Sequence, residues 1–421
     1  MSVKKNVVAN YLGAGVSALA PLLALPFYLS ALGPKQFGLI AFIVMLQALL
    51  TLVDAGMSQA LVREFAIRVN NADGGRYRSS ALLFGFERIY WAFAIAAGSI
   101  TALLADPIAL HWINLDGLPL SLGRDAIYGA AVIFVCQFPG SIYRSVLVGA
   151  QAQVQLNAIA ISCALLRHGG GILVILVWPE LHAYLIWQVA IALLETAVRG
   201  RFAWKTLGQP RNQTVWVSDE LRPILSNVAG MSGAVWLGAL TTQMDKIVLS
   251  RMVSIEQLGY YTIASTIALG ALHLIYPLVQ AVLPRAIQLK QDSVALRRLY
   301  IRLLTLITFA VIAGGLIFVV VGDWFLKTWL GSSMLSTAIQ PILAVLLLGT
   351  VLNAFYNIGY MNWIVQERIG RVFQVNAISF LLSLISLPIL VESYGSIGAA
   401  FGWLAMNLFG LALSLEWLKG K

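Results

Sequence analysis

Twelve long apolar stretches, separated by short polar loops, occupy this chain of 421 residues almost from end to end. Crossing the ~30 Å hydrocarbon core of a bilayer takes about 20 apolar residues in a helix. Lipid offers backbone groups no hydrogen-bond partner, so a spanning segment must be a helix or part of a closed barrel. Barrel strands are about half as long and alternate in polarity. The pattern therefore predicts an all-α integral membrane protein with about twelve transmembrane helices.

The composition agrees with a chain that is embedded in lipid. Charged residues make up 11% of the sequence, whereas about 25% of the residues in a typical soluble domain are charged. The sixth stretch is short, which suggests a local thinning of the bilayer. The expected spans are residues 7–29, 37–61, 81–105, 126–149, 158–178, 184–198, 224–250, 258–283, 300–321, 335–361, 372–390 and 397–417.

The lysines and arginines lie mostly on one side of this topology. With a cytoplasmic N-terminus, 20 of them fall in inside segments and 4 in outside loops. Cytoplasmic loops of membrane proteins carry such an excess of positive charge, so we expect both termini in the cytoplasm. Topology, with attraction to anionic lipid headgroups, accounts for the net charge of +10, and we infer no nucleic-acid binding from it.

The two halves of the chain resemble one another at a steady offset near 220 residues. We expect a six-helix lobe over residues 1–198, a cytoplasmic linker over 199–222 and a second six-helix lobe over 223–421. Parallel repeats of this kind flank a substrate path in transporters that work by alternating access. The matched residues are Asn10 and Asn227, Gly13 and Gly230, Gln36 and Gln257, Gly38 and Gly259, Gln59 and Gln280, Arg63 and Arg285, and Asn157 and Asn376.

Short motifs occur in both halves of the chain. They are Asn10-Tyr11-Leu12-Gly13, Pro26 and Tyr28 before Leu32-Gly33-Pro34, Gln36-Phe37-Gly38, Asp54-Ala55-Gly56 before Arg63, Gln243-Met244-Asp245-Lys246 and Gln257-Leu258-Gly259-Tyr260-Tyr261. With these motifs the chain resembles the Wzx-type polysaccharide (O-antigen) flippases. These belong to the MOP exporter superfamily, together with the multidrug exporters called MATE and the lipid II flippase MurJ. Twelve spans agree with the Wzx branch, since lipid II flippases usually carry two further helices.

The resemblance implies a substrate, a route and partners. It implies two six-helix lobes around a cationic central cavity. Through this cavity an undecaprenyl-diphosphate-linked oligosaccharide would pass from the cytoplasmic to the periplasmic leaflet of the bacterial inner membrane. The expected partners are this lipid-linked glycan, membrane lipids, and the polymerase and chain-length machinery of polysaccharide synthesis. No cofactor is expected, and coupling to a proton or sodium gradient is a hypothesis.

Four cations lie well inside expected spans, where a charge is costly unless it faces a partner, water or a ligand. They are Arg88, Arg144, Arg167 and Lys246. The planar fork of arginine can bind two phosphate oxygens, which a diphosphate requires. With His168, these residues are the candidate substrate-binding residues.

Some of these residues have structural alternatives. Arg144 lies near the cytoplasmic end of its span and Arg88 beside Glu87, so either side chain could snorkel or form an ion pair. Arg167 lies roughly 14 Å into the fifth span, too deep for easy snorkelling. The glycines that follow His168 could loosen the helix and expose backbone donors, although a lone histidine is often a packing residue.

A second group of residues suggests gating or ion coupling. Asp54 could pair with Arg63 at an inner gate, or satisfy a helix end. Asp245 and His273 could bind a coupling ion, which drives transport only if the two access states bind the ion differently. Arg285 is the counterpart of Arg63 in the repeat.

Metal and disulfide sites are not expected. Cys136 and Cys163 both fall within expected helices, and the four histidines are scattered along the chain.

Two other function classes remain as alternatives. A membrane enzyme, such as a glycan polymerase or glycosyltransferase, needs a reactive constellation, but the longest outside loop, residues 106–125, shows no spacing that indicates catalysis or metal binding. A multidrug exporter of the same superfamily fits less well, because a cationic path suits anionic substrates better than cationic drugs. We therefore expect a transporter rather than an enzyme.

Overall fold

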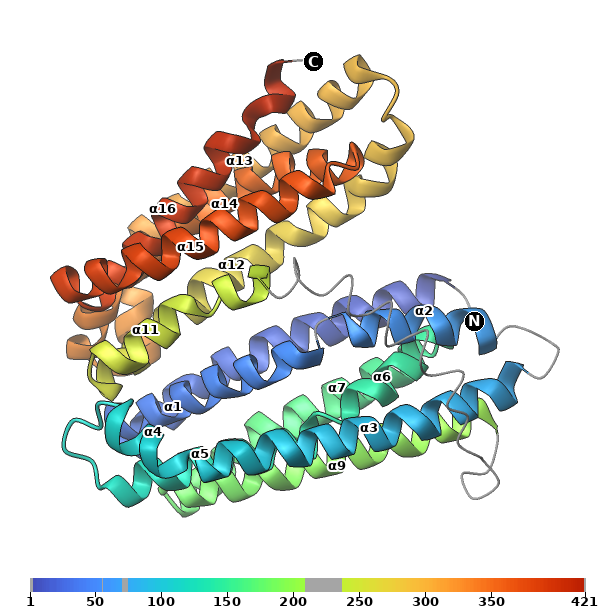
Figure 1. Ribbon diagram of the computed structural model, residues 1–421. Coiled ribbons are helices and arrows are strands. Elements are labelled where there is room, and N and C mark those ends of the chain that lie inside the picture. Colours follow the sequence, from blue (N-terminus) through green and yellow to red (C-terminus); the bar gives the residue numbers. More distant parts are fainter. Residues whose placement is uncertain (1–2, 55, 70–74, 209–236, 420–421) are drawn as a thin grey trace. The chain divides into compact units, whose positions relative to one another are not determined.

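The computed structural model describes residues 3–54, 56–69, 75–208 and 237–419, and these residues are nearly all helical (Figure 1). The chain divides into two compact units, lobe 1 (Met1–Trp236) and lobe 2 (Leu237–Lys421). Within the described residues, nine helices are long and apolar enough to cross a membrane. The expected all-α membrane class is thereby confirmed.

Lobe 1 consists of long helices joined by short connections. Helix α1 is kinked at Gly33, whose φ of +75° lies in the left-handed region that favours glycine, and Pro34 follows the kink. The elements are α1 (Val3–Thr51), η1 (Leu52–Asp54), α2 (Met57–Val69), α3 (Gly75–Leu103), α4 (Ala105–His111), α5 (Leu120–Gln137), α6 (Gly140–Gly149), α7 (Gln153–Leu165), η2 (Leu166–Gly170), α8 (Gly171–Val177) and α9 (Leu181–Leu207).

Several expected spans are interrupted where the sequence contains helix breakers. The second span ends as α1 at Thr51 and resumes as α2 after Gly56, which has a φ of +93°. The fourth divides into α5 and α6 at Pro139, which has no N–H for the helix ladder. The fifth passes through a π-helical turn, η2, before α8. The breaks at η1 and η2 place the charged residues Asp54 and Arg167 inside otherwise apolar segments.

The expected short sixth span is wrong. Helix α9 is 27 residues long and runs through Arg199 to Leu207, so residues 199–207 continue the helix rather than begin the linker. The hydropathy pattern ended this span at residue 198 because charged residues follow. The rest of the expected linker, and most of the expected span 224–250, lie outside the described residues.

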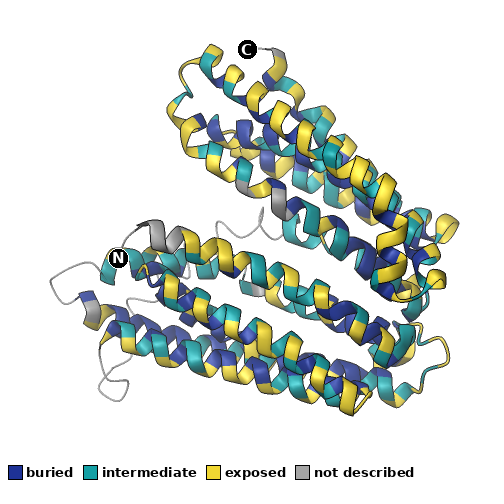
Figure 2. Ribbon diagram, turned by 180° about the vertical axis from the view of Figure 1, so that it is seen from behind, coloured by how far each residue is buried: buried dark blue, intermediate teal, exposed yellow. Residues whose placement is uncertain are grey.

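Lobe 2 is built from six described α-helices. Its core lies between α12, α13 and α14, where Tyr300 packs edge to face against Trp417. The exposed apolar residues of α13 and α15 lie on faces that a bilayer would cover (Figure 2). The elements are α11 (Met244–Met252), α12 (Ile255–Gln288), α13 (Ser293–Leu330), α14 (Ser333–Val365), α15 (Ile369–Tyr394), α16 (Ser396–Ser414) and η4 (Leu415–Lys419).

Candidate functional site in lobe 1

Two arginines share one carboxylate inside lobe 1. Arg167 Nη2 lies 2.9 Å from Glu195 Oε2, and Arg199 Nη2 forms an ion pair with the other oxygen of Glu195. Arg167 also donates from Nη1 to Gln188 Oε1 at 3.2 Å. The side chains of both arginines are 15% exposed and that of Glu195 is 10% exposed. Two cations against one anion leave this buried cluster with a net charge of +1.

Helix α9 supplies three of the four side chains from one face. Gln188, Glu195 and Arg199 are separated by seven and four residues, which brings them to the same side of a helix with 3.6 residues per turn. Arg167 comes from η2, which packs against α9. A guanidinium group that is already hydrogen-bonded in this way keeps a fixed position, so the cluster is preorganised.

The π-helical turn at Leu166–Gly170 contains the glycine run expected to loosen the helix. A π turn displaces the regular i to i−4 ladder and changes which backbone groups need outside partners. The backbone groups of this turn that bind side chains are carbonyl acceptors, whereas N–H donors were expected. Trp187 Nε1 donates to the Leu166 carbonyl at 3.0 Å, and the Tyr28 hydroxyl donates to the His168 carbonyl at 3.3 Å. At Gly170 a Cβ would lie 2.3 Å from the Trp187 ring, so the ring requires glycine there.

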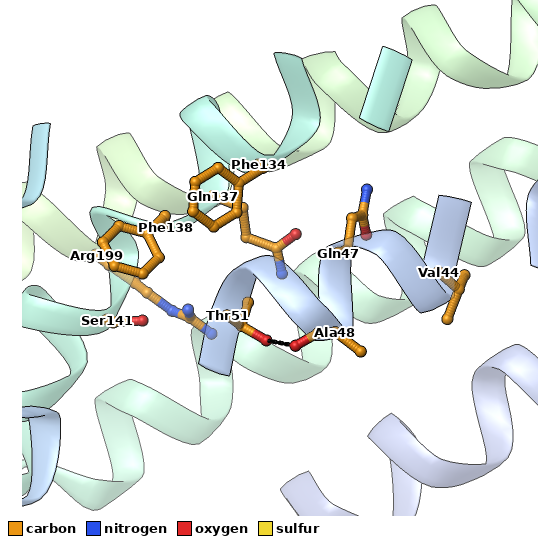
Figure 3. Close-up of a pocket in the computed structure, with 9 residues that line it drawn as sticks. All are labelled: Val44, Gln47, Ala48, Thr51, Phe134, Gln137, Phe138, Ser141 and Arg199. Atoms are coloured by element: carbon orange, nitrogen blue, oxygen red, sulfur yellow. Dashed lines mark hydrogen bonds between the residues drawn. The ribbon is translucent and has the colours of Figure 1, made fainter. Parts of the chain in front are cut away.

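A pocket of about 250 Å³ lies beside Arg199 (Figure 3). Its polar lining combines one guanidinium group with amides and hydroxyls, and two phenylalanine rings form much of the rest. The pocket lies wholly within lobe 1, between α1, the end of α5, the start of α6 and α9. The lining residues are Val44, Gln47, Ala48, Thr51, Phe134, Gln137, Phe138, Ser141 and Arg199.

Gly140 makes room for Arg199 at this pocket. A Cβ on Gly140 would lie 3.0 Å from Thr196 Oγ1 and 3.5 Å from Arg199 Nη1. Among the described residues, Nε of Arg199 has no hydrogen-bond partner although it is buried. Arginine thus retains a donor beyond its ion pair with Glu195.

Asp54 and Arg63 are not brought together by the described contacts. Asp54 accepts hydrogen bonds from the Ser58 hydroxyl at 2.6 Å and the Tyr90 hydroxyl at 2.5 Å. Arg63 is exposed on α2. Asp54 therefore supports the start of α2, which corresponds to the helix-end alternative.

Arg88 and Arg144 are both exposed, unlike Arg167. Arg88 lies over the Phe84 ring, 3.9 Å from its centre, in a cation–π contact. The neighbouring Glu87 points to the other side, where it is buried and accepts a hydrogen bond from Tyr143. Arg144 is exposed on α6, which packs against α9.

Lobe 2 places Asp245 and Lys246 at a smaller pocket of about 190 Å³. Asp245 accepts hydrogen bonds from the Tyr261 hydroxyl at 2.6 Å and from the Lys246 backbone N–H at 2.7 Å. Thr350 lines the same pocket, is 3% exposed, and its hydroxyl has no partner within the described part of the chain. Arg285 is exposed and donates to Gln288 at 3.0 Å. The side chain of His273 lies outside the described residues.

Sequence reasoning missed Arg199 as a site residue. The short sixth span had placed it in a cytoplasmic loop, and it counted only toward the charge asymmetry. The signal was present in the sequence. Gln188, Glu195 and Arg199 are spaced so that they share one face of a helix, which indicates that the helix continues past residue 198. Arg167 and His168, which are separate candidates as site residues, differ in their contacts. Arg167 binds Gln188 and Glu195, whereas Nδ1 of His168 has no hydrogen-bond partner among the described residues.

The family of the chain is decided by a match over residues 31–339, more than half of its length, to the family described as "Polysaccharide biosynthesis protein". The chain belongs to this family. It is also 22% identical to a Shigella flexneri protein named as an O-antigen transporter, over 99% of this chain and 98% of the relative. As expected, this family and its relatives are transporters and flippases, not enzymes.

Solved structures share the fold of this chain at low identity. The lipid II flippase MurJ in an inward closed conformation has a TM-score of 0.74 and 15% identity, over 98% of this chain and 87% of MurJ. An inward-facing MATE multidrug resistance transporter of the MOP superfamily has a TM-score of 0.71 and 12% identity, over 94% and 93% of the two chains. A MATE transporter of Vibrio cholerae has a TM-score of 0.66 and 14% identity, over 99% and 96%. The predicted resemblance to this superfamily is confirmed.

Proposed function

We propose that this protein is a flippase that moves undecaprenyl-diphosphate-linked oligosaccharide repeat units from the cytoplasmic to the periplasmic leaflet. The family match over residues 31–339 carries this proposal. The O-antigen transporter relative and the MurJ fold support a lipid-linked glycan as the substrate. The net positive cluster of Arg167, Glu195 and Arg199 supports an anionic group on that substrate. Transport proceeds by alternating access along a cationic path.

A deletion strain tests the proposal directly. Loss of the gene should remove surface polysaccharide and cause undecaprenyl-diphosphate-linked repeat units to accumulate on the cytoplasmic side. The wild-type chain supplied on a plasmid should restore both. Surface polysaccharide at the normal level in the deletion strain, with no accumulated intermediate, would show that another protein moves this substrate.

The proposed topology has twelve spans in two six-helix lobes, with both termini in the cytoplasm of a bacterium with an inner membrane. The 20 to 4 distribution of positive charges supports this orientation. Reporter fusions near Arg211 and at Lys421 should report cytoplasm, and fusions near Trp112 and Gly331 should report periplasm. A periplasmic reporter at Lys421 would overturn the twelve-span topology.

The proposed substrate contacts are Arg144, Arg167, His168, Arg88 and Lys246. A proton or sodium gradient is proposed to bias the access states through Asp245 or His273, with the polymerase and chain-length machinery as partners. The hydroxyl groups around Asp245 support an ion-binding role, since carboxylate and hydroxyl oxygens suit hard cations. Flipping in sealed vesicles should slow when both gradients are collapsed. An unchanged rate would exclude ion coupling.

A further inference from the structure

The pocket beside Arg199 contains more than a cationic group. Besides the guanidinium group, its lining includes two amides, Gln47 and Gln137, and two hydroxyls, Thr51 and Ser141. In Figure 3 the side chains of Arg199 and Gln137 extend toward the turn of α1 that carries Gln47 and Thr51. An inorganic anion needs mainly hydrogen-bond donors, whereas this set of neutral groups offers acceptors as well.

The two amides are available to a ligand. Neither Gln47 nor Gln137 has a hydrogen-bond partner among the residues that the structure describes. Each amide offers two N–H donors and a carbonyl acceptor, so it can bond to a hydroxyl group in either direction. Thr51 donates its own hydrogen to the Ala48 carbonyl at 2.8 Å, which leaves its oxygen as an acceptor. Donors and acceptors side by side match the hydroxyl groups of a sugar.

The rings of Phe134 and Phe138 provide an apolar wall in the same pocket. Both side chains are 2% exposed, and their ring centres lie 4.9 Å apart. A few polar groups placed against an aromatic wall is the usual composition of a small-molecule site. A sugar ring has such a mixed surface, with apolar C–H groups between its hydroxyls.

The volume limits how much of a substrate can enter. At about 250 Å³ the pocket falls below the ~300–1,000 Å³ of sites that hold drug-sized ligands. An oligosaccharide repeat unit is too large for it, whereas a single sugar ring with its phosphate is of a suitable size.

The charge around the pocket selects for a phosphate. Glu195 pairs with both arginines, so the cluster is rigid and still has a net charge of +1. Arg199 lines the pocket, so its guanidinium group supplies a charged donor there. Hydrogen bonds between a guanidinium group and phosphate oxygens are among the stronger ones in proteins.

We propose that this pocket of lobe 1 is a subsite for one sugar phosphate, with Arg199 binding the phosphate and Gln47 and Gln137 binding the sugar hydroxyls. The inference rests on the proposed function for its place in transport, because a diphosphate-linked glycan begins with a sugar phosphate. The protein would then recognise the lipid-proximal sugar rather than the distal part of the glycan.

Binding of soluble probes to the purified full-length protein in nanodiscs tests the subsite without transport. Ligand-observed NMR would compare glucose 1-phosphate and N-acetylglucosamine 1-phosphate with inorganic phosphate and with the free sugars. At least one sugar phosphate should bind about tenfold more tightly than either of its parts, since each part makes hydrogen bonds that the other lacks. Equal binding of inorganic phosphate and both sugar phosphates would overturn the sugar half of the proposal.

Two variants separate the roles of the lining residues. Arg199→Gln should weaken sugar-phosphate binding about tenfold or more and leave free-sugar binding unchanged. Glu195 keeps its bond to Arg167 in this variant, so the carboxylate is not stranded. The double variant Gln47→Leu, Gln137→Leu should reduce sugar-phosphate binding to the level of inorganic phosphate.

Matched controls come from exposed residues. Arg201→Gln removes an exposed arginine from the same helix, and Gln280→Leu removes an exposed amide from lobe 2. Both should bind sugar phosphate like the wild type. If Arg199→Gln binds as well as Arg201→Gln, the subsite is wrong even when the deletion strain confirms the flippase. If the variants behave as expected but the deletion strain keeps its surface polysaccharide, the subsite stands and the flippase function fails.

Discussion

The two lobes differ in the kind of polar side chain that they place in their interiors. Within the described residues, the buried carboxylates are Glu87 and Glu195, both in lobe 1. Lobe 2 instead contains a neutral chain of amides, in which Asn353 donates to Asn407 at 2.6 Å and Asn357 donates to Asn353 at 2.8 Å. The amides of this chain hydrogen-bond to one another and carry no charge. The cluster around Glu195 has two arginines and one carboxylate, so it has a net charge of +1.

This difference indicates that the buried polar groups of the two lobes have different roles. Burying charges costs more than burying amides, so charges are expected where a ligand or partner uses them. The neutral amide chain of lobe 2 connects α14 to α16 by a hydrogen bond and stabilises the packing of these two helices. The charged cluster of lobe 1 lies beside a pocket and is suited to meet an anion.

The largest effect is expected when the shared carboxylate is removed. Glu195→Ala leaves two guanidinium groups, each 15% exposed, without a counter-ion. Breaking such a pair costs about 3–5 kcal/mol when it is buried, and the residual exposure places this one toward the lower end. The midpoint of thermal unfolding in detergent should fall clearly.

Glu392→Ala is the matched control, because Glu392 is an exposed glutamate of lobe 2. It should unfold at the wild-type temperature. Equal midpoints for the two variants would mean that the ion pairs of lobe 1 contribute nothing to its stability, and the contrast between the lobes would lose its energetic basis.

Removing one arginine should cost less than removing the carboxylate. Arg167→Ala deletes the bonds to Gln188 and Glu195, but Glu195 keeps its ion pair with Arg199. A loss of about 1.5–3 kcal/mol is expected, the range for hydrogen bonds to charged groups. Thermal unfolding measures this loss, and surface polysaccharide should disappear as well. A variant with wild-type stability and no export would show that Arg167 acts on the substrate alone.

Much of this contrast could be predicted from the sequence, and some of it could not. Hydropathy found the apolar segments and the intramembrane charge of Arg167, because a charge among apolar residues is rare and visible. It failed at Arg199, because a window average cannot tell a paired arginine inside a helix from one in a loop. The pairing of Arg199 with Glu195 is local, four residues apart on α9, and becomes visible once the helix is known to continue. The pairing of Glu195 with Arg167 depends on the packing of η2 against α9. The pocket is formed by three stretches far apart in the sequence, residues 44–51, residues 134–141 and Arg199, so its lining could not be read from local patterns.

The neutral chain of lobe 2 should respond differently to single and double substitution. Asn407→Leu leaves the Asn353 amide without its acceptor, at a cost of about 1–3 kcal/mol. The double variant Asn353→Leu, Asn407→Leu should recover part of that loss, because Asn357 keeps its bond to the Asn353 backbone carbonyl at 2.8 Å. Thermal unfolding of the three proteins measures the coupling. Strictly additive losses would show that the two amides do not act as a pair.

The smallest effect on stability, with a large effect on function, is expected at Arg144. This side chain is exposed on α6, so Arg144→Ala should change the free energy of unfolding by no more than about 0.5 kcal/mol. If Arg144 contacts the diphosphate, the variant should still abolish surface polysaccharide while the protein inserts at the normal level. Arg144→Lys should restore export in part, because lysine keeps the charge but loses the bidentate fork. Arg78→Ala, which removes an exposed arginine from α3, is the control and should export normally. Full export by Arg144→Ala would remove Arg144 from the substrate-binding charge of lobe 1, which would then rest on the buried cluster and Arg88.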